Sequence, residues 1–249
     1  KLSFFREYRS LWFFLLAMLL LPFVVGLFEG SSPAVVWNNG GSYSKFIQGL
    51  GIEIFILALF ALSYDLLFGI SGLLSFGHAM FFAVAAYGTG ILLKFSDLPF
   101  FMIVICIILA SIVQALLFSL VLPRVKGITF ALVTLGMATV FHIIVTSTEL
   151  QKFTGSDVGL QGYPVPAFLN PASEKFRFYV IALIILVAMF ILYKTFVKSP
   201  TGRVCIAVRE NEDRAKMLGF NTALFKIIAM LVSSFTAATA GMLHALYQP

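Results

Sequence analysis

Long apolar runs separated by short polar stretches dominate the 249-residue chain. A helix needs about 20 apolar residues to cross a bilayer, and seven runs approach or exceed that length. They cover roughly residues 11–28, 46–67, 74–94, 99–122, 127–147, 178–197 and 223–247. The runs lack the alternating pattern of barrel strands, and hydrocarbon provides no partners for backbone polar groups. The pattern therefore predicts an all-α integral membrane protein, a polytopic helical bundle with about seven membrane segments.

Composition supports a membrane location for most of the chain. Hydrophobic residues make up 60% of it, and 28 residues are Phe. A soluble domain of this length cannot bury so much apolar surface, so we treat residues 1–249 as a single transmembrane domain. The run at 11–28 follows Lys1, Arg6 and Arg9, as the apolar core of a signal peptide would. It is long for a signal peptide and no small-residue cleavage site follows it, so we predict a retained span.

The distribution of Lys and Arg predicts the orientation of the spans. With the N-terminus in the cytoplasm and seven crossings, 12 of the 17 cations lie on the inner side. The inner segments are then 1–10, 68–73, 123–126 and 194–226. Cytoplasmic loops carry such an excess, so we expect the N-terminus and residues 198–222 to be cytoplasmic. If 74–94 only dipped into the membrane, Arg124, Lys126 and the 198–222 segment would lie outside, against this rule.

The segment between the last two runs is the most polar part of the chain, with six charged residues among positions 209–216. Its capping residues predict two short helices: Ser199 before Pro200 begins one, Asn211 begins the other, and Gly219 ends it. Two acid-then-base pairs at i,i+4 spacing would stiffen them, Glu210/Arg214 and Glu212/Lys216. A solvated connector is the alternative. Loops of this length with helices of their own are usually functional, so we predict a docking element.

Polar residues and glycines in the second and third runs are candidates for a solute path or an interrupted helix. They are the ionisable residues Glu53, Asp65 and His78 and the linker glycines Gly69, Gly72 and Gly77. Charged groups at membrane depth are costly, and a broken helix exposes backbone groups that can line a path. We favour helix capping or headgroup contact for Asp65 and His78. For Glu53, a buried hydrogen bond and a place on the path are equal alternatives.

Small residues at helical spacing mark two of the runs. They are Ala79, Ala83, Ala86 and Gly90 in the third run, and Ser233, Ala237, Gly241 and Ala245 in the seventh. Such stripes let helix backbones approach closely in lipid. We expect them to serve internal packing rather than a moving or inter-subunit interface.

Outside the runs, residues 148–177 form a turn-rich loop that faces outward on the predicted orientation. We expect this external loop to meet a partner, with a passive connector as the alternative.

Motifs for catalysis and metal binding are missing from the sequence. No G-x-x-x-x-G-K-[ST], G-x-S-x-G or H-E-x-x-H occurs, so we predict no ATPase site and no enzyme activity. His142 and His244 lie on apolar runs without a second ligand at metal spacing, so we expect interior histidines and no metal site. Cys106 and Cys205 imply no disulfide framework.

The charged segment resembles the EAA loop of ABC-importer permeases, whose core reads E-A-A-x-x-x-G. The matching run is DRAKMLG at 213–219. Ala215 and Gly219 agree with the pattern, Asp213 replaces the Glu, and Arg214 departs from it. The wider run from Ser199 onward is similar to the hydrophobic (branched-chain) amino acid permeases of the LivM type.

Two further stretches resemble the same family. Residues 62–90 include its S-F-G-H-A signature at 75–79, and residues 125–164 resemble its fifth span and the loop after it. The resemblance covers the chain from about residue 46 onward. Because members of the family continue with further membrane segments beyond the position of Pro249, we expect this chain to be a C-terminally truncated copy.

The resemblance implies a permease subunit of an ABC importer in the cytoplasmic membrane of a bacterium or archaeon. It would pair with a second permease subunit and sit on two ATPases, which bind ATP and Mg²⁺. An external binding protein would deliver hydrophobic amino acids at the 148–177 loop. Residues 198–222 would be the coupling segment that docks on an ATPase, through Arg209, Glu210, Asn211, Glu212, Asp213, Arg214, Ala215 and Gly219. This chain itself would bind no cofactor and no nucleic acid.

Three other functions stay open at this point. A urea or short-amide ABC permease is closely related, and substrate choice lies largely in the binding protein. A gradient-driven secondary transporter would need membrane carboxylates for ion coupling, for which Glu53 is the serious candidate. A membrane scaffold would move no solute at all.

Overall fold

The computed structural model describes all residues except 1–8, 31, 38–41, 122–124 and 126. The cations Lys1, Arg6, Arg124 and Lys126, which contribute to the predicted orientation, lie outside the described residues. Within the described residues the regular structure is entirely helical.

Six helices among the described residues are long and apolar enough to cross a membrane. They are α2 (Arg9–Phe28), α4 (Ser42–Tyr64) with its π-helical continuation η1 (Asp65–Ile70), α6 (Phe100–Ser119), α7 (Ile128–Thr146), α9 (Lys175–Lys198) and α12 (Thr222–Tyr247). A seventh apolar helix, α5 (Ala79–Phe95), is shorter, with 17 residues. The prediction of an all-α multi-pass membrane protein is confirmed. The third segment differs from prediction, because its helix begins at Ala79 and leaves 71–78 non-helical.

Shorter elements connect the spans. The first two spans are joined by α3 (Pro33–Trp37). The loop between α7 and α9 contains η2 (Thr148–Leu150), α8 (Gln151–Thr154), η3 (Ser156–Val158) and η4 (Ala167–Leu169). The charged segment forms α10 (Pro200–Glu210) and α11 (Glu212–Met217).

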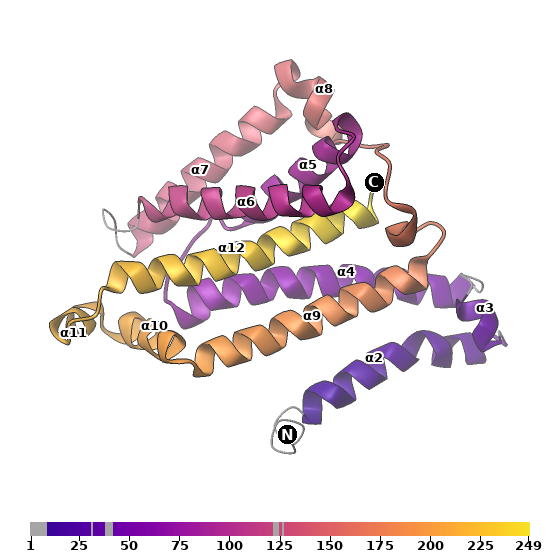
Figure 1. Cartoon of the computed structure of the whole chain (residues 1–249), viewed down its shortest axis with the longest axis horizontal. Coiled ribbons are helices and arrows are strands. Elements are labelled where there is room, and N and C mark those ends of the chain that lie inside the picture. Colours follow the sequence, from indigo (N-terminus) through magenta and orange to yellow (C-terminus); the bar gives the residue numbers. More distant parts are fainter. Residues whose placement is uncertain (1–8, 31, 38–41, 122–124, 126) are drawn as a thin grey trace.

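The helices run between two ends of the molecule (Figure 1). We call the end with α10 and α11 the hairpin end, and the end with the α7–α9 loop the loop end. At the loop end, the side chains of Lys175 and Tyr247 both approach Gly49. Lys94 Nζ donates to the carbonyl of Gln161 there, at 2.8 Å. The segments that connect successive spans therefore alternate between the hairpin end and the loop end, as predicted.

Helix α12 is the centre of the bundle and packs against α4, α5 and α6. Ser233 and Ala237 on its small-residue stripe are fully buried, and Ser233 Oγ donates to the carbonyl of Ser63 in α4 at 2.5 Å. A Cβ at Gly241 would collide with the carbonyl oxygen of Phe82 in α5. The stripe therefore serves internal packing, as predicted, because small side chains let the backbones of α12 and α5 touch.

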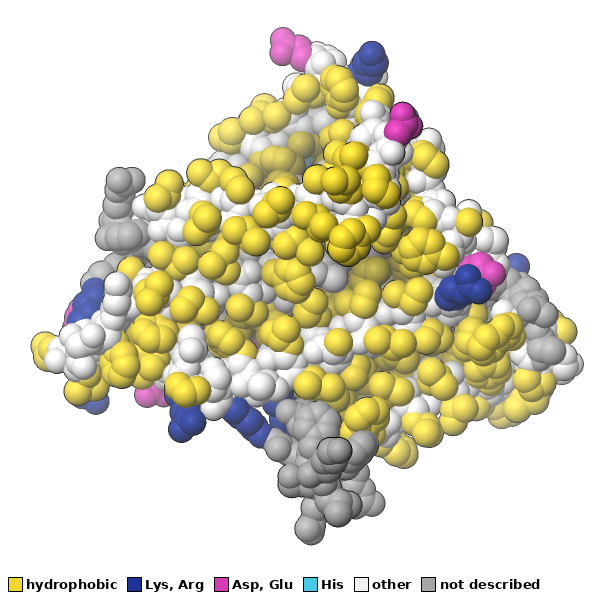
Figure 2. Space-filling model, in the orientation of Figure 1, with side chains coloured by type: hydrophobic (Ala, Val, Ile, Leu, Met, Phe, Trp, Pro, Cys, Tyr) yellow, Lys and Arg dark blue, Asp and Glu magenta, His cyan; other side chains and the backbone are white. Residues whose placement is uncertain are grey.

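The outer surface matches a membrane environment. Figure 2 shows apolar side chains across the middle of the visible face, with Lys, Arg, Asp and Glu at its margins. Phe13 on α2 and Phe101 on α6 are 74% and 75% exposed. In water such exposure would be costly, whereas lipid tails solvate it.

We predict that Gly241→Leu destabilises the bundle by about 1–3 kcal/mol, because a leucine would force α12 away from α5. Gly136 is the matched control, since it lies on α7 with no atom within 4 Å of a Cβ at that position. Thermal unfolding in detergent should show a lower Tm for Gly241→Leu than for Gly136→Leu. Equal midpoints would contradict the close packing of α12 on α5.

Candidate functional site

The predicted caps of the charged segment form in the structure. Ser199 Oγ accepts a hydrogen bond from the Gly202 N–H at 3.1 Å, and Asn211 Oδ1 accepts one from the Arg214 N–H at 2.8 Å. Gly219 follows α11 with φ +89°, a conformation that favours glycine. The segment 199–221 is therefore a helical hairpin with defined ends rather than a loose connector, and we call it the hairpin.

Glu212 fixes the hairpin to the start of α12. Its carboxylate lies 2.8 Å from Lys226 Nζ and 3.0 Å from Lys216 Nζ, and it accepts a hydrogen bond from Thr222 Oγ1 at 3.1 Å. Burial raises the pKa of Glu212, but the bonds from Lys226, Lys216 and Thr222 outweigh it and hold the pKa at about 2. Of the two predicted i,i+4 pairs, Glu212/Lys216 forms. Glu210 and Arg214 form no ion pair in the part of the chain that the structure describes.

The eight predicted docking residues point in different directions. Six of them are exposed: Arg209, Glu210, Asn211, Asp213, Arg214 and Gly219. Ala215 is 3% exposed and packs inside the hairpin, and Glu212 is held by Lys226. Arg209 Nη1 donates to the carbonyl of Gly69 in η1, which is a contact with the membrane part. Ala215, Glu212 and Arg209 thus make contacts within the chain, and the docking role of the eight residues stays a prediction.

Sequence reasoning missed an apolar surface at the end of the hairpin. Met217, Leu218 and Phe220 are 86%, 72% and 42% exposed, and we call these three residues the apolar tip. They surround Gly219 at the turn where the chain leaves α11 for α12. Apolar residues flanking the glycine of a charged segment were the available signal, since a solvated turn would normally be polar.

The interruption predicted between the second and third runs is present. After η1 ends at Ile70, residues 71–78 are non-helical and turn back beside α4. Gly72 has φ +71°, and its N–H bonds the carbonyl of Phe68 at 3.2 Å, which ends the helix. His78 then contacts Ser63, seven residues before Ile70, which corresponds to a depth of about 10 Å along the helix. We call residues 71–78 the break.

Buried hydrogen bonds hold the break in place. Ser63 Oγ donates to the carbonyl of Phe60 at 2.6 Å, so it accepts from His78 Nε2 at 2.7 Å. His78 is 2% exposed, and its Nδ1 has no partner among the described residues, nor does the nearby hydroxyl of Ser75. Gly77 packs so closely on the carbonyl of Thr134 in α7 that no side chain would fit. His78 therefore joins the break to α4, which is a structural contact but neither the helix capping nor the headgroup contact that we favour from the sequence.

The remaining candidates of this group lie at the surface of the chain. Asp65 is exposed at the start of η1, and its carboxylate lies against Gly69. Glu53 is also exposed, because the buried face of α4 carries Ile52 and Phe55 instead. The buried hydrogen bond considered for Glu53 is therefore wrong, and its place on a solute path stays a prediction.

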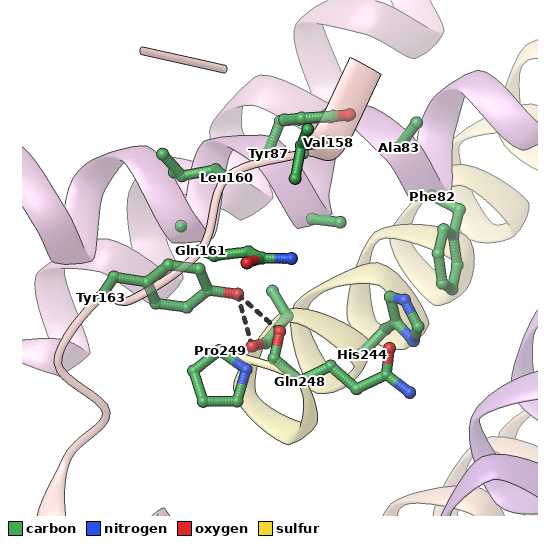
Figure 3. A pocket seen from close by; sticks show the side chains of 14 residues that line it. Phe82, Ala83, Tyr87, Val158, Leu160, Gln161, Tyr163, His244, Gln248 and Pro249 are labelled. Atoms are coloured by element: carbon green, nitrogen blue, oxygen red, sulfur yellow. Dashed lines mark hydrogen bonds between the residues drawn. The ribbon is translucent and has the colours of Figure 1, made fainter. Parts of the chain in front are cut away.

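A cavity of about 420 Å³ opens at the loop end (Figure 3). Its walls come from α5, the loop after α7 and the end of α12, and Tyr163 closes one side by donating to the carbonyl of Ala245 at 2.7 Å. The other labelled lining residues are Phe82, Ala83, Tyr87, Val158, Leu160, Gln161, His244, Gln248 and Pro249. No lining side chain is Asp, Glu, Lys or Arg, so the cavity suits an uncharged group with an apolar part.

The structure refines one prediction about small residues and corrects one about histidines. Ala83, Ala86 and Gly90, part of the small-residue stripe of the third run, line this cavity, and Gly90 is buried against Leu160 and Tyr163 of the loop. The two histidines are not interior: His244 is half-buried at the cavity and packs against Phe82, and His142 is exposed on α7. The apolar runs show that these segments are helical, but not which side of each helix its neighbours cover. No group of three metal ligands occurs within the described residues.

A helical bundle with a broken span, a solute-sized cavity and a rigid hairpin outside the membrane defines a multi-pass membrane protein built like a transporter. The family described as branched-chain amino acid transport system / permease component matches residues 46–249. The chain belongs to this family, as the sequence resemblance indicates.

Individual relatives agree with the family match. The high-affinity branched-chain amino acid transport system permease protein LivM of Salmonella typhimurium is 27% identical over 220 residues, covering 78% of this chain and 51% of that protein. The LivM protein of Escherichia coli is 25% identical with the same coverage. A probable branched-chain amino acid transport permease protein LivM of Methanocaldococcus jannaschii is 36% identical over 92 residues, which are 36% of this chain and 27% of the relative.

The chain thus spans about half the length of the first two relatives. No solved structure matches it significantly.

We predict that Glu212 makes the stability of the hairpin depend on pH. Its folded pKa of about 2 lies below the ordinary value of 4.5, so its contribution is complete above pH 4.5 and is lost as pH falls toward 2. Thermal unfolding in detergent should therefore show a smaller drop in Tm from pH 6 to pH 3 for Glu212→Gln than for wild type. Glu210→Gln, an exposed neighbour, should keep the wild-type pH dependence. An unchanged drop in Glu212→Gln would show that this network does not stabilise the hairpin.

Proposed function

We propose that this chain is a permease subunit of an ABC importer that moves hydrophobic, branched-chain amino acids across the cytoplasmic membrane. Membership of the permease family over residues 46–249 carries the proposal. Relatives in both bacteria and an archaeon are named as permease proteins for branched-chain amino acids. In such an importer ATP and Mg²⁺ bind to the partner ATPases and not to this chain.

The hairpin is the part that we propose to contact an ATPase. Its caps and the Glu212 network make it stiff, and its apolar tip extends beyond the spans. An apolar surface outside the membrane is stabilised when a partner covers it. Arg214 and Asp213 beside the tip would provide the polar rim of that interface.

The solute would enter at the opposite end of the bundle. The cavity of about 420 Å³ lies at the loop end and has the size of small-molecule sites. In the proposed orientation it faces outward, where the 148–177 loop would receive an external binding protein. A second permease subunit would complete the membrane path.

Co-purification tests the docking role. Leu218→Glu places a charge on the apolar tip, and we expect ATPase binding to fall at least about tenfold, the equivalent of 1.4 kcal/mol. Leu98→Glu is the matched control, because Leu98 is exposed at the loop end. ATP-driven leucine uptake in proteoliposomes should fall with binding in Leu218→Glu and persist in Leu98→Glu. Full uptake in Leu218→Glu without bound ATPase would favour a gradient-driven transporter.

Thiol labelling tests the orientation. Cys205 is 1% exposed and burial raises its pKa to about 11, so it should react slowly with maleimides on either side. Met217→Cys places a reactive thiol at a position that is 86% exposed. We expect an impermeant maleimide to label it only after cells are permeabilised, whereas Val158→Cys, on the exposed external loop, is labelled in intact cells. Labelling of Met217→Cys in intact cells would place the hairpin on the wrong side for an ATPase.

A further inference from the structure

The hairpin touches η1, the last turn of the second span, at a point away from the apolar tip. Arg209, near the end of α10, donates a hydrogen bond from Nη1 to the carbonyl oxygen of Gly69 in η1. Carbonyls at the end of a helix lack partners within it, and the helix dipole favours a cation there. Arg209 therefore satisfies the turn at which the second span stops.

A second contact lies at the start of the break. Gly72 has φ +71°, and a Cβ at this position would lie 2.5 Å from Cγ and 3.2 Å from Cβ of Arg209. Glycine is required both by the left-handed backbone and by the lack of space. The stem of Arg209 thus packs on the backbone of the break while its guanidinium group holds the end of η1.

Helix α10 is fixed to the spans on either side of it. Gly202 lies directly against the backbone of Val197 at the end of α9. Cys205 is buried and its Sγ lies 3.6 Å from the carbonyl oxygen of Phe225 in α12. Because Glu212 also fixes α11 to α12, the hairpin is a stiff body, and a displacement of its tip must move Arg209.

The hairpin and the break are not joined by continuous apolar packing. A cavity of about 170 Å³ lies between them, and Gly72, Leu73, Val208, Arg209 and Glu212 are among its lining residues. Arg209 crosses this loosely packed junction and bonds to Gly69 on the other side. The two contacts of one side chain are therefore a specific mechanical link between the hairpin and the break.

We propose that Arg209 is a positioning residue that couples movement of the hairpin to the break between the second and third membrane segments. It acts through Gly69 and Gly72 and does not touch solute. When an ATPase moves the hairpin, Arg209 carries the end of η1, the break and the start of α5 with it as one body. The proposal rests on the proposed function, since an ATPase must move the hairpin.

The first test compares Arg209→Ala with Arg203→Ala in the full transporter with its ATPases and binding protein. Arg203 is the matched control, an exposed arginine on the same helix. We expect Arg209→Ala to retain ATPase binding and ATP hydrolysis but to move at least about fivefold less leucine per ATP. Arg209→Lys should recover part of the loss, because its ammonium group can still donate to the carbonyl but lacks the planar fork of arginine. Arg203→Ala should keep the wild-type ratio. A wild-type ratio in Arg209→Ala overturns the proposal.

The second test replaces the link by a covalent bond. In a background without Cys106 and Cys205, Gly72→Cys and Arg209→Cys together place two Cβ atoms 3.2 Å apart, from which a small outward shift of the backbone reaches disulfide distance. We expect the oxidised pair to restore leucine transport per ATP relative to Arg209→Cys alone, and reduction to remove the gain. Gly72→Cys alone controls for strain at the positive φ. If oxidation stops transport while ATPase binding persists, the contact must open during the cycle and the rigid link is wrong.

Hydrogen exchange on the isolated subunit separates this proposal from the proposed function. Arg209→Ala should raise amide exchange at least about threefold in residues 66–73 but not in α6, because only the former lose the contact. Unchanged amide exchange in residues 66–73 overturns the link, whether or not the variant changes transport. If the exchange changes but wild type binds no ATPase and shows no ATP-driven uptake, the contact is real, whereas the proposed function and the coupling role both fail.

Discussion

Hydrocarbon cannot hydrogen-bond to a peptide group, so the non-helical residues 71–78 can lie at membrane depth only where protein covers them. The bundle meets this constraint from several sides. His78 is held by Ser63 of α4, Gly77 lies against Thr134 of α7, and Ser233 of α12 binds the carbonyl of Ser63. The close approach of these helices depends on small residues, which explains why the break and the small-residue stripe of α12 occur in one protein.

The break also connects the two functional ends of the molecule. At the hairpin end, Arg209 holds the last turn of η1 and the backbone of Gly72. From the break, α5 runs to the loop end, where Phe82 and Tyr87 line the large cavity. The short helix α5 thus follows the break at one end and lines the cavity along its length, so it lies between the two ends of the molecule.

Much of this architecture was predictable from the amino-acid sequence. The spans follow from the length of the apolar runs, because a helix is the structure that satisfies its own backbone in lipid. The two hairpin helices follow from local chemistry, since Ser199, Asn211 and Gly219 each act on neighbouring residues. The interruption near Gly72 and Gly77 and the membership of a permease family were also evident, because both depend on short, contiguous stretches.

The directions of side chains were not predictable from the sequence, because helical periodicity shows which residues share a face but not which neighbour that face contacts. Glu53 is exposed, Ala215 is buried and Ala83 lines a cavity, and none of these follows from helical periodicity alone. The link from Arg209 to Gly69 joins positions 140 residues apart, and no local pattern encodes such a contact. Local composition therefore accounts for where this chain forms helices and where it stops them, whereas the packing of distant segments sets what each polar group can bind.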